Sequence, residues 1–116
     1  MDENIRLITK PLTRSELKVI AAERFGDMVK AVVDVEKVIM AVGGEMHADE
    51  EAVLLGDSSS QENLWGINLY PENFGESFVE FDSMINLRPR QGNRSRGVDD
   101  PALRQRILEI VKKLVL

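Results

Sequence analysis

The chain has a single histidine, which lies two positions from an acidic residue on either side. If this segment is extended, Glu45, His47 and Asp49 point to the same side, because side chains alternate along an extended chain. Two carboxylates and an imidazole can hold a divalent metal with open positions, and an imidazole with a pKa of about 6.5 can act as a general acid or base. These residues are therefore the candidate catalytic group, although their spacing matches no dedicated metal motif and leaves the metal unknown. In the alternative interpretation, Asp49 caps a helix and His47 only donates a hydrogen bond to a carbonyl or to a neighbouring acid.

A second group of polar side chains lies on two segments with a strong strand pattern, residues 64–70 and 78–88. Alternation along the second segment places its acidic, amide and basic side chains on one face. Asparagine is unfavourable in strands, so the asparagines in these segments indicate either a function or a structural hydrogen bond. A solvent-exposed sheet face explains the acidic residues equally well. The candidate ligand-binding residues of these segments are Asn68, Asp82, Asn86 and Arg88.

Residues 86–96 contain four arginines and no acid, although the whole chain has 20 acidic and 15 basic residues. Arginine binds phosphate or carboxylate with two parallel hydrogen bonds, and a glycine–asparagine turn can present backbone N–H groups to an anion. In the alternative interpretation, the loop pairs with the acidic segment 45–62 and holds it in place. The glycine spacing matches neither of the common phosphate-binding motifs. The further candidate ligand-binding residues in this loop are Arg90, Asn93, Arg94 and Arg96.

Length and composition indicate one ordinary globular domain over residues 1–116, with 43% hydrophobic and 30% charged residues. The absence of cysteine excludes disulfides, thiol catalysis and cysteine-ligated metals. The first ten residues lack the basic start and apolar core of a signal peptide, and no apolar run has the length of a membrane span. We therefore expect a cytoplasmic protein that does not enter a membrane. A net charge of −5 disfavours nucleic acid as a partner without excluding it.

Residues 28–42 fit either a helix or a hairpin, because apolar residues recur at helical spacing but seven of the fifteen residues are valine or isoleucine. A hairpin with its turn at Glu36-Lys37 places Ala31 opposite Val42 and Val33 opposite Met40, and one face is then wholly apolar. This consistency of register favours the hairpin.

The remaining elements follow from caps and periodicity. Thr13 and Glu16 form a capping box for a helix at 14–25, and Asp100 with Pro101 begins a C-terminal helix. The other expected elements are a short edge strand at 4–9, a helix at 50–55 capped by Asp49, and strands at 64–70 and 78–88. The sequence thus predicts an α+β fold, an antiparallel sheet of about four strands (two hairpins) packed on one face against the N-terminal and C-terminal helices. Any chemistry is expected on the other face or at its edge.

Three segments, GGEMHADEEAVLL, SSSQENLWGINLYP and EFDSMINLRPRQGNRSRGVDDP, follow one another along the chain. In this order they resemble the signature segments of a small family of uncharacterised prokaryotic proteins, a domain of unknown function. The resemblance extends over the chain from about residue 10 and implies no activity, substrate or partner. In that family the segment that matches 36–38 often ends in glycine, where this chain has Val38. A glycine there suits the turn of a hairpin better than the middle of a helix.

These patterns lead to three hypotheses on function. The first is a small binding domain that recognises an anionic ligand or partner, preferably one with phosphate, through the arginine-rich loop. The second is a metal-assisted or acid–base hydrolase centred on His47. The third is a homodimer formed through the second face of the hairpin, where Val32, Ile39 and Ala41 are expected to be exposed. A pocket shared by His47 and the arginines would favour an enzyme or a small-ligand site.

Overall fold

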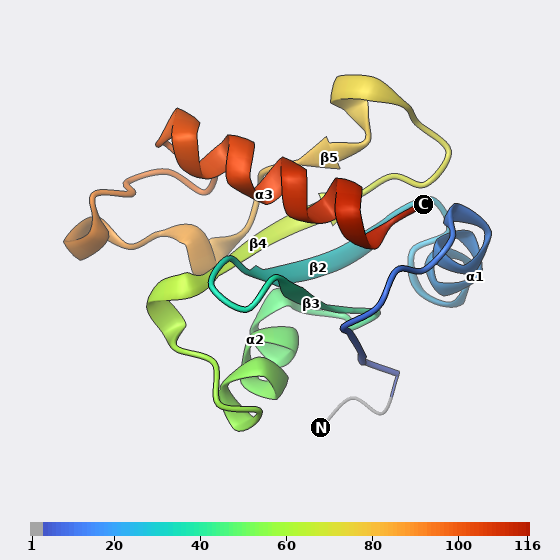
Figure 1. Cartoon of the computed structure of the whole chain (residues 1–116), viewed down its shortest axis with the longest axis horizontal. Coiled ribbons are helices and arrows are strands. Elements are labelled where there is room, and N and C mark those ends of the chain that lie inside the picture. The colour runs from blue at the N-terminus through green and yellow to red at the C-terminus, as the bar shows by residue number, and fades with distance from the viewer. Residues whose placement is uncertain (1–3) are drawn as a thin grey trace.

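The computed structural model describes residues 4–116, which form three α-helices and a five-stranded antiparallel sheet in the order β1-β3-β2-β4-β5. The α+β class is confirmed, with five strands rather than about four. Figure 1 shows α3 crossing one face of the sheet, while α2 lies against the opposite face. The elements are β1 (Arg6–Ile8), α1 (Arg14–Arg24), β2 (Val29–Asp34), β3 (Ile39–Val42), α2 (His47–Gly56), β4 (Leu64–Leu69), β5 (Val79–Glu80) and α3 (Pro101–Leu114).

The hairpin of β2 and β3 has the predicted register, with Ala31 opposite Val42 and Val33 opposite Met40. All four of these side chains are fully buried. They pack in the core that α1 and α3 build with the sheet, because every second residue of each strand points to the same face. The helical interpretation of residues 28–42 is therefore excluded, and one apolar face of the hairpin supplies the centre of the main core.

The opposite side of the sheet, which we call the α2 face, has its own smaller core. Val32 and Ala41 from the hairpin pack there with Leu54 of α2 and Leu64 of β4, and all four are fully buried. The prediction that Val32 and Ala41 are exposed for dimerisation was wrong, because α2 covers them. No helix among residues 4–116 is long and apolar enough to span a bilayer.

The predicted caps of the first and last helices are confirmed. Thr13 Oγ1 accepts from the N–H of Glu16 at 3.1 Å, and the Glu16 carboxylate accepts from the N–H of Thr13 at 3.2 Å. Asp100 accepts from Ala102 N–H at 2.9 Å at the start of α3. The capping role predicted for Asp49 was wrong, because α2 begins at His47 and Asp49 lies within its first turn.

The long strand predicted at 78–88 was also wrong, because β5 contains only Val79–Glu80. Beyond β5 the chain forms short 3-10 helices at Met84–Asn86 and Pro89–Gln91. The strand ends early because an asparagine side chain, rather than a further strand residue, pairs with the backbone of β4. The Asn86 amide bonds both the N–H and the C=O of Gly66 in β4, at 2.8 and 2.9 Å. Asparagine side chains compete with backbone ladders in this way, and the alternation pattern does not reveal it.

The turn between β2 and β3 contains an unusual residue, Val38, whose φ is 57°. The turn is held by Asp34, whose Oδ1 accepts from the N–H groups of Glu36 and Lys37 at 2.9 Å each. A branched side chain in the left-handed region is a genuine outlier, since its Cβ approaches the following carbonyl. Val38 therefore stores strain in an otherwise well-bonded turn.

We expect Val38→Gly to raise the free energy of unfolding by about 1 kcal/mol. The left-handed conformation costs a residue with a side chain about 1–2 kcal/mol, and glycine removes this cost. The greater freedom of glycine in the unfolded chain offsets about 0.5–1 kcal/mol of that gain. Urea denaturation measures the change. Val35→Gly is the matched control, because Val35 lies in the same turn without a positive φ, and it should lower stability. A Val38→Gly protein that is less stable than the parent would contradict the assignment of strain.

Candidate functional site

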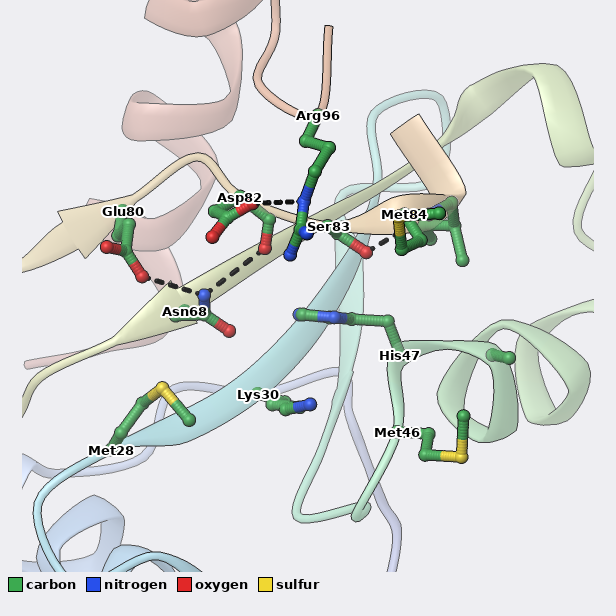
Figure 2. A pocket seen from close by; sticks show the side chains of 12 residues that line it. Met28, Lys30, Met46, His47, Asn68, Glu80, Asp82, Ser83, Met84 and Arg96 are labelled. Carbon is green, nitrogen blue, oxygen red and sulfur yellow. Dashed lines mark hydrogen bonds and ion pairs between the residues drawn. The ribbon is translucent and has the colours of Figure 1, made fainter. Parts of the chain in front are cut away.

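The α2 face contains a pocket of about 370 Å³ next to the start of α2. Its floor follows from strand register, since Lys30 of β2 lies opposite Asn68 of β4, and Asn68 lies opposite Glu80 of β5. These three polar side chains thus form one row across three neighbouring strands. The pocket also includes residues from all three candidate groups of the sequence, as Figure 2 shows. Its charged and polar lining includes Lys30, His47, Asn68, Glu80, Asp82 and Arg96.

His47 reaches this pocket because Gly66 leaves room for it. A Cβ placed on Gly66 would lie 3.2 Å from Cδ2 of His47 and 2.5 Å from Cβ of Ser83. With glycine there, both side chains can pack directly over β4. His47 is the first residue of α2, and Figure 2 shows its ring extending across the pocket toward Asn68. The ring is largely buried, with 8% of the residue exposed.

One hydrogen bond sets the tautomer of His47. Nε2 lies 2.8 Å from the carbonyl oxygen of Ile67. A carbonyl can only accept, so Nε2 carries the hydrogen, and Nδ1 of the neutral ring is an acceptor. In this neutral state no described residue donates to Nδ1, whereas a protonated ring would donate a hydrogen bond to the Asn68 side chain, which favours the charged form.

The pKa of His47 is lowered from its usual 6.5, mainly because burial penalises the charged ring. The positive charge of Lys30 lowers this pKa further, while the Ile67 carbonyl, Asn68 and Asp82 act in the opposite direction. The ring is therefore neutral at pH 7. In that state it can accept a hydrogen bond or a proton from a molecule in the pocket.

Asn68 is held by two acceptors and leaves its own acceptor open. Its Nδ2 donates to Oε1 of Glu80 at 2.9 Å and to the carbonyl of Asp82 at 3.2 Å. Its Oδ1 is buried and has no hydrogen-bond partner among residues 4–116. A buried polar atom without a partner is rare in folded proteins and costs free energy.

Two cations border the pocket. Arg96 Nε binds Oδ1 of Asp82 at 2.7 Å, and both side chains are about half exposed, 56% and 44%. Lys30 Nζ lies 5.4 Å from the centre of the Phe25 ring. No described residue gives Nζ of Lys30 or the two Nη atoms of Arg96 a hydrogen-bond partner. These donors are thus available to a bound anion.

Three of the five methionines of the chain also line this pocket: Met28, Met46 and Met84. Met46 and Met84 are exposed by 58% and 64%. Methionine is flexible and polarisable, so such a wall adapts to different apolar groups. The pocket therefore combines a polar floor with an adjustable apolar rim.

The predicted grouping of Glu45, His47 and Asp49 is not assembled. Glu45 binds Arg24 at 2.9 Å, and Asp49 is exposed to solvent. Because α2 begins at His47, residues two positions apart point in different directions rather than to one side. Among the residues that the structure describes, no group of three or more histidine or acidic side chains could hold a metal ion.

Two of the predicted ligand-binding asparagines serve the structure instead. Asn86 is fully buried and bonds Gly66, as described above. Asn93 Nδ2 donates to the carbonyls of Asn86 at 2.7 Å and Gly97 at 2.8 Å, and its Oδ1 accepts from Asp99 N–H at 2.8 Å. These amides stabilise the loop around the arginines and are not available to a ligand.

Arg88 attaches the basic loop to the neighbouring segment. Its guanidinium stacks 4.0 Å from the centre of the Trp65 ring and donates to the carbonyl oxygens of Gln61, at 2.6 Å, and Leu64. Burial lowers the pKa of Arg88, whereas the charge of Glu51 raises it. The loop is thus held against the acidic segment, as one hypothesis expected, but through backbone carbonyls rather than through carboxylates.

The other arginines divide between the pocket and the solvent. Arg96 lines the pocket, whereas Arg90 and Arg94 are exposed and lie outside it. Sequence reasoning missed Lys30 and Glu80 as site residues. Lys30 carried a usable signal, because it is one of only two charged residues in the otherwise apolar segment 29–35 of a predicted strand.

Comparison with known proteins places the chain in a family without assigning an activity. No match to the chain was found among curated proteins or among solved structures. Residues 6–114 match the model of a family described as protein of unknown function (DUF5674). This match spans nearly the whole chain, so the protein belongs to the DUF5674 family.

Proposed function

We propose that this protein is a small binding domain whose pocket on the α2 face takes a small molecule with a phosphate or carboxylate group. The observation that supports the proposal most is the presence of Lys30 and Arg96 in one pocket with His47. A pocket of this kind, with an apolar rim and a few convergent polar groups, is typical of small-molecule sites.

The available donors favour an anion. Lys30 Nζ and the Nη atoms of Arg96 have no hydrogen-bond partner among the described residues, so binding an anion there breaks no internal bond. Arg96 is also held by Asp82 through Nε, which orients its guanidinium toward the pocket. Arg90 and Arg94 remain exposed nearby in the chain and contribute long-range attraction for an anion without contacting it.

Arg96→Gln is expected to weaken the binding of inorganic phosphate roughly tenfold, because one charge-assisted hydrogen bond contributes about 1.5–3 kcal/mol. The measurement is a titration of the ¹⁵N-labelled protein with sodium phosphate at constant ionic strength, followed by amide chemical shifts. In the parent protein, the shifts should centre on the residues around Lys30, His47 and Asn68.

Arg94→Gln is the matched control for this experiment. It removes the same charge from the same loop, but Arg94 is exposed and outside the pocket. Its phosphate affinity should stay within about twofold of the parent value, since a distant exposed charge is screened by salt. Equal losses in both variants would mean that the loop attracts anions only through its net charge, and the proposal would fail.

A hydrolytic role for His47 stays a prediction for the same pocket. The open Nδ1 of the neutral ring, which can accept a hydrogen bond, can also accept a proton. The homodimer also stays a prediction, although the apolar face on which it was based is buried beneath α2.

A further inference from the structure

The pocket contains two hydrogen-bond acceptors without donors, and they restrict what the ligand can be. One is Nδ1 of His47, because Nε2 of the ring is bonded to the Ile67 carbonyl. The other is Oδ1 of Asn68, a residue that is only 6% exposed. Figure 2 shows the two side chains facing each other across the pocket. A carboxylate or a fully ionised phosphate ester group alone would leave both acceptors unsatisfied, since such groups bring further acceptors rather than donors.

The orientation of the Asn68 amide is determined by its partners. Its nitrogen bonds Oε1 of Glu80 and the carbonyl of Asp82, and both of these atoms can only accept. A rotated amide would place its oxygen against two acceptors and lose both bonds. Oε1 of Glu80 is held in turn by the hydroxyl of Tyr70 at 3.1 Å. The hydrogen bonds of Nδ2 therefore fix the orientation of the amide, with Oδ1 as the atom left unbonded.

The donor that these acceptors require is neutral. The charge of Lys30 already opposes protonation of His47, so a second cation beside the ring would meet the same repulsion. The carboxylates of Glu80 and Asp82 attract an ammonium group only weakly, because Asp82 is already ion-paired with Arg96 and Glu80 already accepts from Asn68 and Tyr70. A hydroxyl group donates one hydrogen bond without adding charge, and it can reach an acceptor beside the cations.

We propose that the ligand is a hydroxylated small anion, whose hydroxyl groups donate separately to His47 and Asn68 while its carboxylate or phosphate group binds Lys30 and Arg96. This inference rests on the proposed function, and it defines the substrate class of the same pocket. The volume of about 370 Å³ suits a compact molecule, near the lower end of the range of about 300–1,000 Å³ for ligand pockets.

Two pairs of probes of matched size test the hydroxyl group and separate the two anion classes. Glycolate is compared with propionate, and 2-hydroxyethyl phosphate with n-propyl phosphate, by amide chemical-shift titration at pH 7.5. In at least one pair, the hydroxylated member should bind about tenfold tighter than its alkyl partner, because the alkyl group leaves unpaired the buried acceptor that the hydroxyl group would satisfy. Methoxyacetate, which keeps the oxygen but lacks the hydrogen, should bind no better than propionate.

His47→Gln is expected to reduce the tenfold preference to about twofold, whereas Arg94→Gln should leave it unchanged. If neither member of either pair binds, the proposed function itself fails. If both members bind equally, the pocket is an anion site and the hydroxyl inference is wrong. The hydroxyl inference is also wrong if methoxyacetate binds as tightly as glycolate. This comparison uses the parent protein and therefore does not depend on whether His47→Gln folds.

Discussion

Replacing Gly66 with alanine is expected to lower the free energy of unfolding by about 3 kcal/mol or more and to disturb the pocket. The new Cβ would lie 2.5 Å from Cβ and 2.6 Å from Oγ of Ser83, which is 1% exposed. Neither atom can retreat easily, since Ser83 N–H bonds the carbonyl of Arg96 at 2.9 Å. Inserting a methyl group into a packed site typically costs about 1–3 kcal/mol, and separating these segments also strains the bonds from Asn86 to Gly66.

Urea denaturation measures this loss, with Gly56→Ala as the matched control. Gly56 ends α2, and a Cβ there would meet nothing within 4 Å. That variant should be at least as stable as the parent, because alanine is favoured over glycine in helices by up to about 1 kcal/mol. The double variant Gly66→Ala with Ser83→Gly removes the closest contact and should recover part of the loss. If Gly66→Ala proves as stable as Gly56→Ala, close packing does not explain the glycine.

Replacing Asn86 with alanine is expected to cost about 3–5 kcal/mol. The change removes three hydrogen bonds, to the N–H and C=O of Gly66 and to the carbonyl of Arg96 at 2.9 Å. Because Asn86 is fully buried, the partners are left unsatisfied rather than exposed to water, and each such group costs about 1–3 kcal/mol. The difference in free energy of unfolding from the parent protein checks this value.

Asn73→Ala serves as the control for Asn86→Ala. Asn73 is exposed, and its side chain makes one weak bond to the carbonyl of Ser77 at 3.3 Å. Its loss should cost about 0.5 kcal/mol or less, as is usual for surface positions. A cost below about 1 kcal/mol for Asn86→Ala would show that water replaces the lost bonds, and would contradict the role given to its amide.

The parts of the fold that sequence reasoning predicted correctly depend on neighbouring residues. The capping box of Thr13 and Glu16 lies within four residues. The register of the β2–β3 hairpin follows from the alternation of side chains on either side of one short turn. The strand predicted at 78–88 failed because its outcome depends on Gly66, twenty positions away from Asn86. The alternating pattern of polar residues is the same whether the polar side chains face water from a strand or form hydrogen bonds to the backbone of another segment.

The candidate site shows the same limit. Asn68 and Asn86 both interrupt strand patterns, and the sequence offers no means of telling which one is structural. The distinction lies in their partners, since Asn86 is fully bonded while Asn68 keeps an unpaired oxygen. His47 and Arg96 meet in one pocket because β5 pairs with β4 so that Asn68 lies opposite Glu80. The sequence does not determine this register, since the connection between β4 and β5 is long.

The amide of Asn86 also occupies backbone groups at an edge of the sheet. β5 has only two residues, so on that side most of β4 lacks a neighbouring strand. An open strand edge invites pairing with a foreign strand and thereby aggregation. At Gly66 the Asn86 side chain occupies both backbone groups that such a strand would need. Arg88 in turn donates to the carbonyl of Leu64, the first residue of β4. Side chains thus occupy backbone groups of β4 without extending the sheet, and the protein can keep a two-residue strand beside its pocket without offering β4 as a template for aggregation.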